Sequence, residues 1–166
     1  MPSNLAHKPQ PQVRVRSAGP DDLDALFELE ERVFATDRLS RPSLRRLLKS
    51  RTAEVLVADE GGHLAGAAVA LYRQRSKVAR LYSIAVAPHS AGRGVGPLLL
   101  QAVEAAASAR GCTSIRLEVH ETNTAAIARY RKSAYREFGR HRRYYEDGGD
   151  ALRFEKPLPG PSKRRA

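Results

Sequence analysis

The stretch from Ile84 to Leu100, IAVAPHSAGRGVGPLLL, most constrains what this chain can fold into. An apolar run ends at Val86, and Pro88 cannot donate to a sheet ladder because it has no N–H. Glycines follow at positions 92, 94 and 96, and Leu98–Leu100 then opens an apolar helix. A strand, a glycine-rich loop and a helix in this order leave bare backbone N–H groups next to the positive end of the helix. The stretch therefore predicts a cradle for a phosphate group.

The glycine loop differs from two common nucleotide-binding loops. Pro97 stands where the dinucleotide motif G-x-G-x-x-G has its third glycine. The G-K-[ST] ending of a nucleoside-triphosphate loop is not present. The glycines alone also fit a tight strand-to-helix turn without a ligand.

Length and composition indicate one domain. A chain of 166 residues can bury a substantial core. We expect the domain to span residues 13–158, between a polar, disordered tail at 1–12 and a basic tail at 159–166. No apolar run reaches the ~20 residues of a membrane span, and the first twelve residues lack the apolar centre of a signal peptide. Cys112 is the single cysteine and zinc motifs are absent, so we expect a cytoplasmic protein with no disulfide, no metal and no membrane contact.

The formal net charge of +11 has two interpretations. Basic residues gather in segments 38–51 and 129–143, which could contact a ribosome or a nucleic acid. The same charge could be a solvated surface that also attracts a polyphosphate cofactor. We favour the second interpretation because no recognition-helix motif and no cluster of stacking rings accompanies the charge.

Hydrophobic periodicity predicts an α/β fold. Strands are expected at 13–16, 54–59, 63–72, 78–86, 114–119, 137–145 and 151–156, and helices begin near Pro20, Ser40, Leu98 and Asn123. This order is typical of a mixed sheet of about seven strands flanked by about four helices in a single domain.

A second set of candidate residues lies in LEVHETNTAAIARYRKSAY, from Leu117 to Tyr135. Glu118 interrupts an otherwise apolar strand, and Tyr130 lies two helical turns beyond Asn123 on the same face. The three side chains could converge on one crevice. Each also has a purely structural explanation, because Asn123 could be a helix cap, Tyr130 a core aromatic with a satisfied hydroxyl, and Glu118 the partner of Arg116.

The glycine loop resembles the acetyl-CoA motif of the GNAT superfamily of N-acetyltransferases, V-x-P-x-x-[RQ]-x-x-G-x-[GA]. The match is at Val86, Pro88, Gly94 and Gly96, and the chain departs at Ala91, where Gln or Arg is usual. The resemblance implies an acetyl-CoA co-substrate, with its pyrophosphate on the loop N–H groups and its pantetheine arm beside the preceding strand. The cofactor-binding residues that it implies are Ile84, Ala85, Val86, Gly92, Arg93, Gly94, Val95, Gly96, Pro97 and Asn123.

The pattern L-E-V-x-x-x-N-x-x-A-x-x-x-Y is similar to the branch of this superfamily that acetylates N-terminal amines of proteins. The resemblance implies that Glu118 is the general base and that Tyr130 is the general acid at the CoA sulfur. The final hairpin resembles the substrate side of the same branch. A departure occurs at Ala134, where a helix-ending glycine is usual, and an alanine at positive φ costs roughly 1 kcal/mol.

These observations predict acetyl transfer from acetyl-CoA to a primary amine, most favourably a protein N-terminal α-amine. At pH 7 about a tenth of α-amines are neutral, against about four in ten thousand lysines, so a single carboxylate base suits an α-amine better. A lysine or a small-molecule amine is the alternative acceptor. A non-catalytic CoA-binding module and a ribosome- or RNA-binding module are alternatives of another class.

Overall fold

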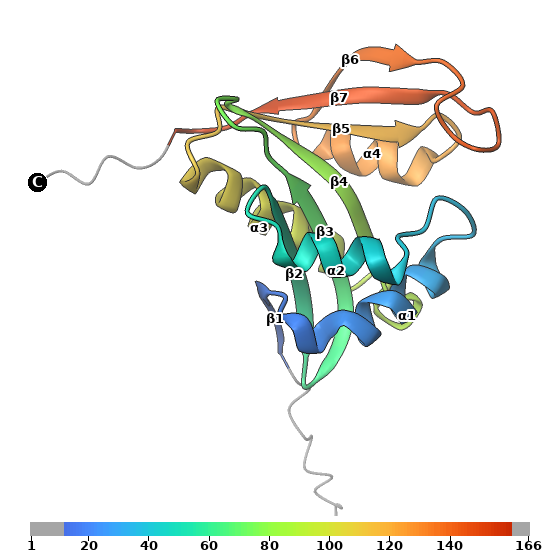
Figure 1. The fold of residues 1–166 in the computed structure, drawn as a ribbon. Helices are drawn as coiled ribbons and strands as arrows, with labels where there is room; N and C mark the ends of the chain where they lie inside the picture. The colour runs from blue at the N-terminus through green and yellow to red at the C-terminus, as the bar shows by residue number, and fades with distance from the viewer. Residues whose placement is uncertain (1–11, 161–166) are drawn as a thin grey trace, which may run out of the picture.

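The computed structural model describes residues 12–160, which form one seven-stranded sheet with helices on both faces (Figure 1). The strand order is β1-β2-β3-β4-β5-β7-β6, and every neighbouring pair is antiparallel except β4 and β5. In chain order the elements are β1 (Val13–Ser17), α1 (Leu23–Val33), α2 (Arg41–Lys49), β2 (Ala53–Glu60), β3 (His63–Leu71), β4 (Val78–Val86), α3 (Val95–Ala109), β5 (Ser114–His120), α4 (Thr124–Lys132), β6 (Arg136–His141) and β7 (Ala151–Pro157). The predicted α/β class, element order and single domain are confirmed.

The sheet separates two hydrophobic cores. Successive strand side chains point to opposite faces, so Val55 and Val57 of β2 pack with α1 and α2, while Leu56 and Ala58 pack with α3. The core on the α3 side also receives Tyr130 from α4. The near-continuous apolar runs of β2 and β3 are explained by this burial on both faces.

The strands β4 and β5 part in the middle of the sheet. They pair only where Val78–Leu81 lies beside Ser114–Leu117. Just beyond that point the ladder between β3 and β4 skips Tyr82, which makes Tyr82 the extra residue of a β-bulge. A bulge bends its strand and increases its twist, so β4 continues beside β3 and turns away from β5. One edge of residues 83–86 is consequently left without a strand partner among the described residues.

The prediction for the last hairpin was wrong in one boundary. A strand was expected to reach Tyr145, but β6 ends at His141. Arg143 takes a left-handed φ of 51°, and its N–H donates to the carboxylate of Asp150 at 3.0 Å. This local conformation replaces strand pairing with a folded loop that carries Tyr144 and Tyr145.

The predicted tails lie almost wholly outside the described residues, since residues 1–11 and 161–166 are not described. Within residues 12–160, no helix is both long enough and apolar enough to cross a membrane.

Candidate active site

A cavity of about 710 Å³ opens where β4 and β5 part. Both predicted catalytic side chains line it, Glu118 from β5 and Tyr130 from α4. Three of the predicted cofactor residues line it as well, namely Ile84, Val86 and Asn123. The divergence of the two strands therefore brings together residues from the two sequence motifs.

The glycine loop adjoins this cavity at the start of α3. Gly94 caps the helix in the left-handed region, with a φ of 81°, and has no side chain to cap the first-turn donors. The N–H groups of Val95 and Gly96 lie in the first turn, where an α-helix supplies no acceptor. Pro97 fits the same turn because its missing N–H would be unpaired there. The loop thus presents backbone donors and the positive end of a 15-residue helix.

Two predicted cofactor residues have side chains directed elsewhere. Arg93 makes a two-point ion pair with Glu60, at 2.6 and 3.1 Å, and its backbone N–H donates to the carbonyl of Ser90. The side chain of Ala85 is buried in the α1–α2 core, so only the backbone of Ala85 is left for a contact with a cofactor. The side chain of Arg93, which the resemblance implies for the cofactor, is therefore occupied by Glu60 in this structure.

Tyr130 has a buried ring and a hydroxyl without a partner. The residue is 6% exposed and packs edge-on against Tyr135, with ring centroids 5.6 Å apart. No hydrogen-bond partner for its hydroxyl occurs within residues 12–160, and the residue lines the cavity. Burial raises the pKa of Tyr130 to about 12, although the charge of Arg129 opposes the rise. The phenol is therefore protonated at neutral pH and has a free proton to donate into the cavity.

Glu118 pairs with Arg80 of β4. The Arg80 Nε donates to Glu118 Oε2 at 3.1 Å, and Arg80 Nη2 donates to the hydroxyl of Tyr144 at 2.7 Å. The alternative pairing of Glu118 with Arg116 does not occur, because Arg116 pairs with Glu155. Arg80 thus holds the carboxylate in the cavity and ties it to the β6–β7 loop.

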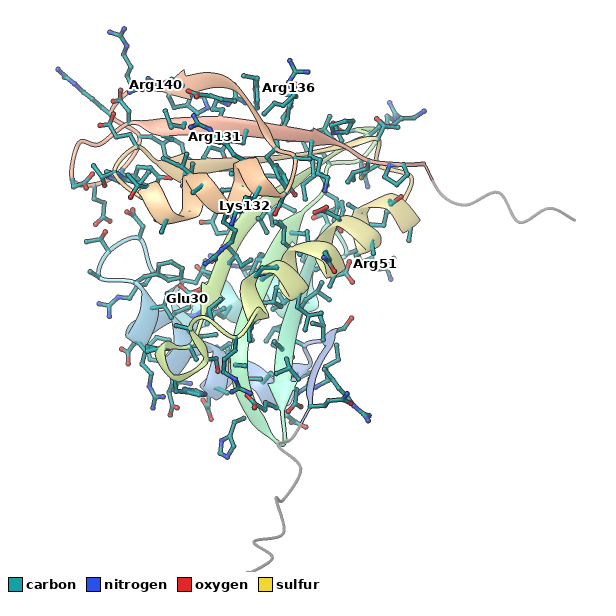
Figure 2. The ribbon with its side chains drawn as sticks, turned by 180° about the vertical axis from the view of Figure 1, so that it is seen from behind. Glu30, Arg51, Arg131, Lys132, Arg136 and Arg140 are labelled. Atoms are coloured by element: carbon teal, nitrogen blue, oxygen red, sulfur yellow. The ribbon has the colours of Figure 1, made fainter. Side chains whose placement is uncertain are left out.

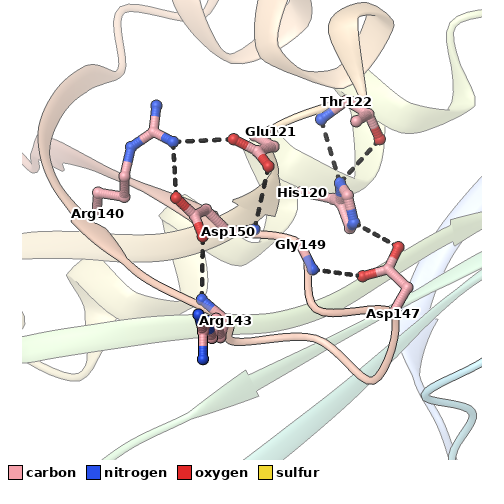
Figure 3. A network of polar contacts seen from close by, with 8 residues as sticks. All are labelled: His120, Glu121, Thr122, Arg140, Arg143, Asp147, Gly149 and Asp150. Atoms are coloured by element: carbon pink, nitrogen blue, oxygen red, sulfur yellow. Dashed lines mark hydrogen bonds and ion pairs between the residues drawn. The ribbon is translucent and has the colours of Figure 1, made fainter.

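His120 anchors the β6–β7 loop (Figure 3). Its Nδ1 accepts from the N–H of Thr122 at 3.1 Å, so Nε2 carries the proton and donates to Asp147 at 2.8 Å. Its ring stacks on Tyr145, with centroids 4.8 Å apart. Both ring nitrogens of His120 are engaged in hydrogen bonds. His120 therefore positions the β6–β7 loop with Tyr144 and Tyr145, called the aromatic loop below, and is not free to move a proton.

Asn123 is a helix cap as well as a cavity residue. Its side-chain oxygen accepts from the N–H of Ala126 at 3.2 Å, as an N-cap residue does at the start of α4. The cap orients α4 so that Ala126 and Tyr130 face the cavity.

The cavity residues that sequence reasoning missed include Glu30, Arg80 and Arg129. Glu30 is 7% exposed and accepts the N–H of Leu39 at 3.0 Å, and burial raises its pKa. Helical spacing from Leu26 could have placed Glu30 on the buried face of α1. Arg129 lies three residues beyond Ala126, which could have placed it on the cavity face of α4.

The comparisons with known proteins agree with this geometry. The model of the acetyltransferase (GNAT) family matches residues 23–135, which include the glycine loop, Glu118 and Tyr130. The chain belongs to the GNAT family of acetyltransferases. Enzymes of the GNAT family use acetyl-CoA as co-substrate.

Relatives and solved structures of the GNAT family span most of the chain. The N-alpha-acetyltransferase RimI of Mycobacterium tuberculosis is 34% identical over 150 residues, covering 85% of this chain and 90% of the relative. The mycothiol acetyltransferase of Clavibacter michiganensis is 31% identical over 144 residues, covering 81% of this chain and 46% of that longer protein. The ribosomal-protein-S18-alanine N-acetyltransferase of Escherichia coli superposes with a TM-score of 0.81 at 26% identity, covering 93% of this chain and 99% of that structure.

The residues of this GNAT chain fit a CoA thioester. Gly96 leaves a space that a side chain would fill, because a Cβ there would lie 2.8 Å from Arg129 Nη1 and 3.6 Å from Val86. The free edge of residues 83–86 offers backbone groups to an extended amide chain. The same cavity contains a carboxylate and a phenol, which are an acceptor and a donor of protons.

Proposed function

We propose that this GNAT acetyltransferase transfers the acetyl group of acetyl-CoA to the α-amine of a protein N-terminus. The proposal rests on two side chains that line one cavity. The carboxylate of Glu118 can accept a proton, and the unpartnered hydroxyl of Tyr130 can donate one. The RimI and S18-alanine N-acetyltransferase relatives support the α-amine as acceptor, because their names describe that substrate class.

The cofactor would lie along β4 and the start of α3. The N–H groups of Gly94, Val95 and Gly96 would hold its pyrophosphate, and the free edge of residues 83–86 would pair with its pantetheine amides. Asn123 and Ala126 line the side of the cavity opposite that edge. This placement directs the thioester toward the cavity that both Glu118 and Tyr130 line.

The chain's residues would move two protons. An amine attacks a thioester only as the neutral base, so Glu118, directly or through a water molecule, takes the proton that the nitrogen loses. Tyr130 donates its phenolic proton toward the sulfur as the carbon–sulfur bond breaks. The cation of Arg80 beside the acceptor position would disfavour a bound ammonium, which favours the neutral amine.

The acceptor would enter between the aromatic loop and the end of α1. Tyr144 and Tyr145 line this part of the cavity together with Phe34 and Asp37. Aromatic walls with hydroxyl groups suit the backbone and the first side chain of a peptide. A small-molecule amine is the second candidate, and the mycothiol acetyltransferase relative favours it.

The replacement Glu118→Gln tests the base. It should lower kcat/KM by about 10²–10⁴-fold, the usual contribution of a positioned base, with the largest loss at low pH where neutral amine is scarce. Wild-type kcat/KM should rise with pH and level off once the α-amine of the acceptor has lost its proton. The measurement is the pH profile of CoA release with a peptide acceptor.

The matched control is Glu121→Gln, which changes a neighbouring carboxylate that pairs with Arg140 outside the cavity. Its pH profile should equal that of the wild type. An unchanged profile for Glu118→Gln would remove Glu118 from the proton transfer.

A further inference from the structure

Arg129 of α4 reaches across to the first turn of α3. A Cβ built on Gly96 would lie 2.8 Å from its Nη1 and 3.3 Å from its Cζ. The guanidinium therefore rests against the second residue of α3, at the positive end of that helix. A cation at this end of a helix is electrostatically unfavourable unless an anion lies between them.

Nothing in the described chain supplies that anion. Of the two arginines that line the cavity, Arg80 pairs with Glu118, whereas Arg129 makes no ion pair and no side-chain hydrogen bond within residues 12–160. Arg131, on the same helix, does have an acidic partner in Glu137. The free guanidinium and the free N–H groups of Val95 and Gly96 thus border the same space.

The glycine loop itself lacks a side-chain cation for a phosphate. Ala91 occupies the position where Gln or Arg is usual in the motif, and it is exposed. Arg93 is two residues further on, but both of its terminal nitrogens bind Glu60. A cation for the phosphates of CoA must therefore come from outside the loop.

We propose that Arg129 binds the pyrophosphate of acetyl-CoA and replaces, from α4, the side chain that the loop lacks at Ala91. The proposal rests on the proposed use of acetyl-CoA and names a residue that the motif does not contain. Its guanidinium would donate charge-assisted hydrogen bonds to the phosphate oxygens that the first turn of α3 also binds. The contact would also fix the cofactor against α4, which carries Tyr130.

The test is the affinity of the protein for CoA and for dephospho-CoA, measured by titration calorimetry. Dephospho-CoA keeps the pyrophosphate and lacks the 3′-phosphate. Arg129→Leu should weaken both ligands equally, by roughly 10- to 100-fold, the range of a lost hydrogen bond to a charged group. A loss confined to CoA would assign Arg129 to the 3′-phosphate and overturn the proposal. Unchanged affinities would show that Arg129 only fills the cleft, and would overturn it too.

Two further variants sharpen the result. Lys132→Leu removes one exposed positive charge from the same helix and should leave both affinities unchanged (Figure 2). An equal loss in Lys132→Leu would attribute the effect to net charge and contradict the proposal. Ala91→Arg in the Arg129→Leu background should recover affinity, and no recovery would contradict a shared phosphate. A wild-type protein that binds neither ligand would instead refute the proposed cofactor.

Discussion

At the scale of single residues, the surroundings of Tyr130 leave its phenolic proton available to the cavity. Tyr130 is buried among Tyr135, Phe154 and the α3 core, yet its hydroxyl is left for the cavity. Tyr135, five residues on, is buried in the same core, but its hydroxyl donates to Glu104 at 3.4 Å. The two tyrosines therefore make a matched pair that differs in the availability of the phenolic proton.

Tyr130→Phe should lower kcat by about 10²–10⁴-fold, because it removes a positioned proton donor and leaves the ring packing intact. The affinity for CoA should hardly change, and steady-state kinetics with calorimetry separates the two quantities. Tyr135→Phe is the control, and it should keep kcat near the wild-type value. A Tyr130→Phe enzyme with full turnover would reduce Tyr130 to a packing residue.

The sequence predicts the positions of Glu118 and Tyr130 because both follow from short-range periodicity. Glu118 stands out in an apolar strand, and Tyr130 shares a helical face with Asn123. Arg80 and Arg129 could not be found in the same way. Both side chains reach parts of the chain that are distant in sequence. Arg80 pairs with Glu118 of the adjacent strand β5, and Arg129 rests against Gly96 of α3.

At the scale of secondary-structure elements, the end of α4 fixes Tyr130. The Tyr135 N–H donates to the Tyr130 carbonyl at 3.0 Å, and the Ala134 N–H donates to the Arg131 carbonyl at 3.2 Å. These two bonds form a Schellman motif, which requires a left-handed residue, and Ala134 has a φ of 70°. The contact of the Tyr130 and Tyr135 rings closes the motif. The predicted strain at Ala134 thus lies in the turn that holds the proposed acid.

Ala134→Gly should raise the free energy of unfolding by roughly 1 kcal/mol, because glycine adopts positive φ without the Cβ penalty. In a chain of this size that change raises Tm by about 2–4 °C, which calorimetry resolves. The control is Ala128→Gly, at an exposed position in the middle of the same helix. It should lower the free energy of unfolding by roughly 1 kcal/mol. A fall in stability for Ala134→Gly would contradict the assigned strain.

The order of elements was predictable from the sequence, whereas the bulge that opens the cavity was not. Apolar runs and turn residues locate β2, β3 and β4, and β4 spans the residues expected for it. The bulge at Tyr82 depends on the register between β3 and β4, which is set by the packing of both faces. The early end of β6 likewise depends on the left-handed conformation of Arg143 and the bond of its N–H to the carboxylate of Asp150, which hydrophobic periodicity does not indicate.

At the scale of the whole molecule, some of the basic side chains on the surface have acidic partners. Arg131, Lys132, Arg136 and Arg140 lie on α4 and β6 (Figure 2). Arg140 is neutralised by Glu121 and Asp150, each at 2.9 Å. The net charge of +11 would steer a polyanionic cofactor toward the protein, which is the interpretation that we favour for this charge.

The choice of acceptor amine depends on the whole molecule, and the proposed function depends most on that choice. The cavity is bounded by the β6–β7 loop, the end of α1 and β5, so three distant segments define what amine can enter. An α-amine has a pKa of about 7.7–8.0 and is far more often neutral at pH 7 than a lysine amine, with a pKa of about 10.4. A site with one carboxylate base should therefore discriminate strongly between the two.

The most direct measurement is the initial rate of CoA release with three acceptors at equal concentration and pH 7. These are a peptide with a free N-terminal alanine and no lysine, the same peptide blocked at its N-terminus and carrying one lysine, and a small amino sugar. We predict that the free N-terminal peptide reacts at least tenfold faster than the other two, and that Glu118→Gln abolishes most of this rate. A faster reaction of the lysine peptide or of the amino sugar would contradict the assignment of a protein N-terminus as the acceptor.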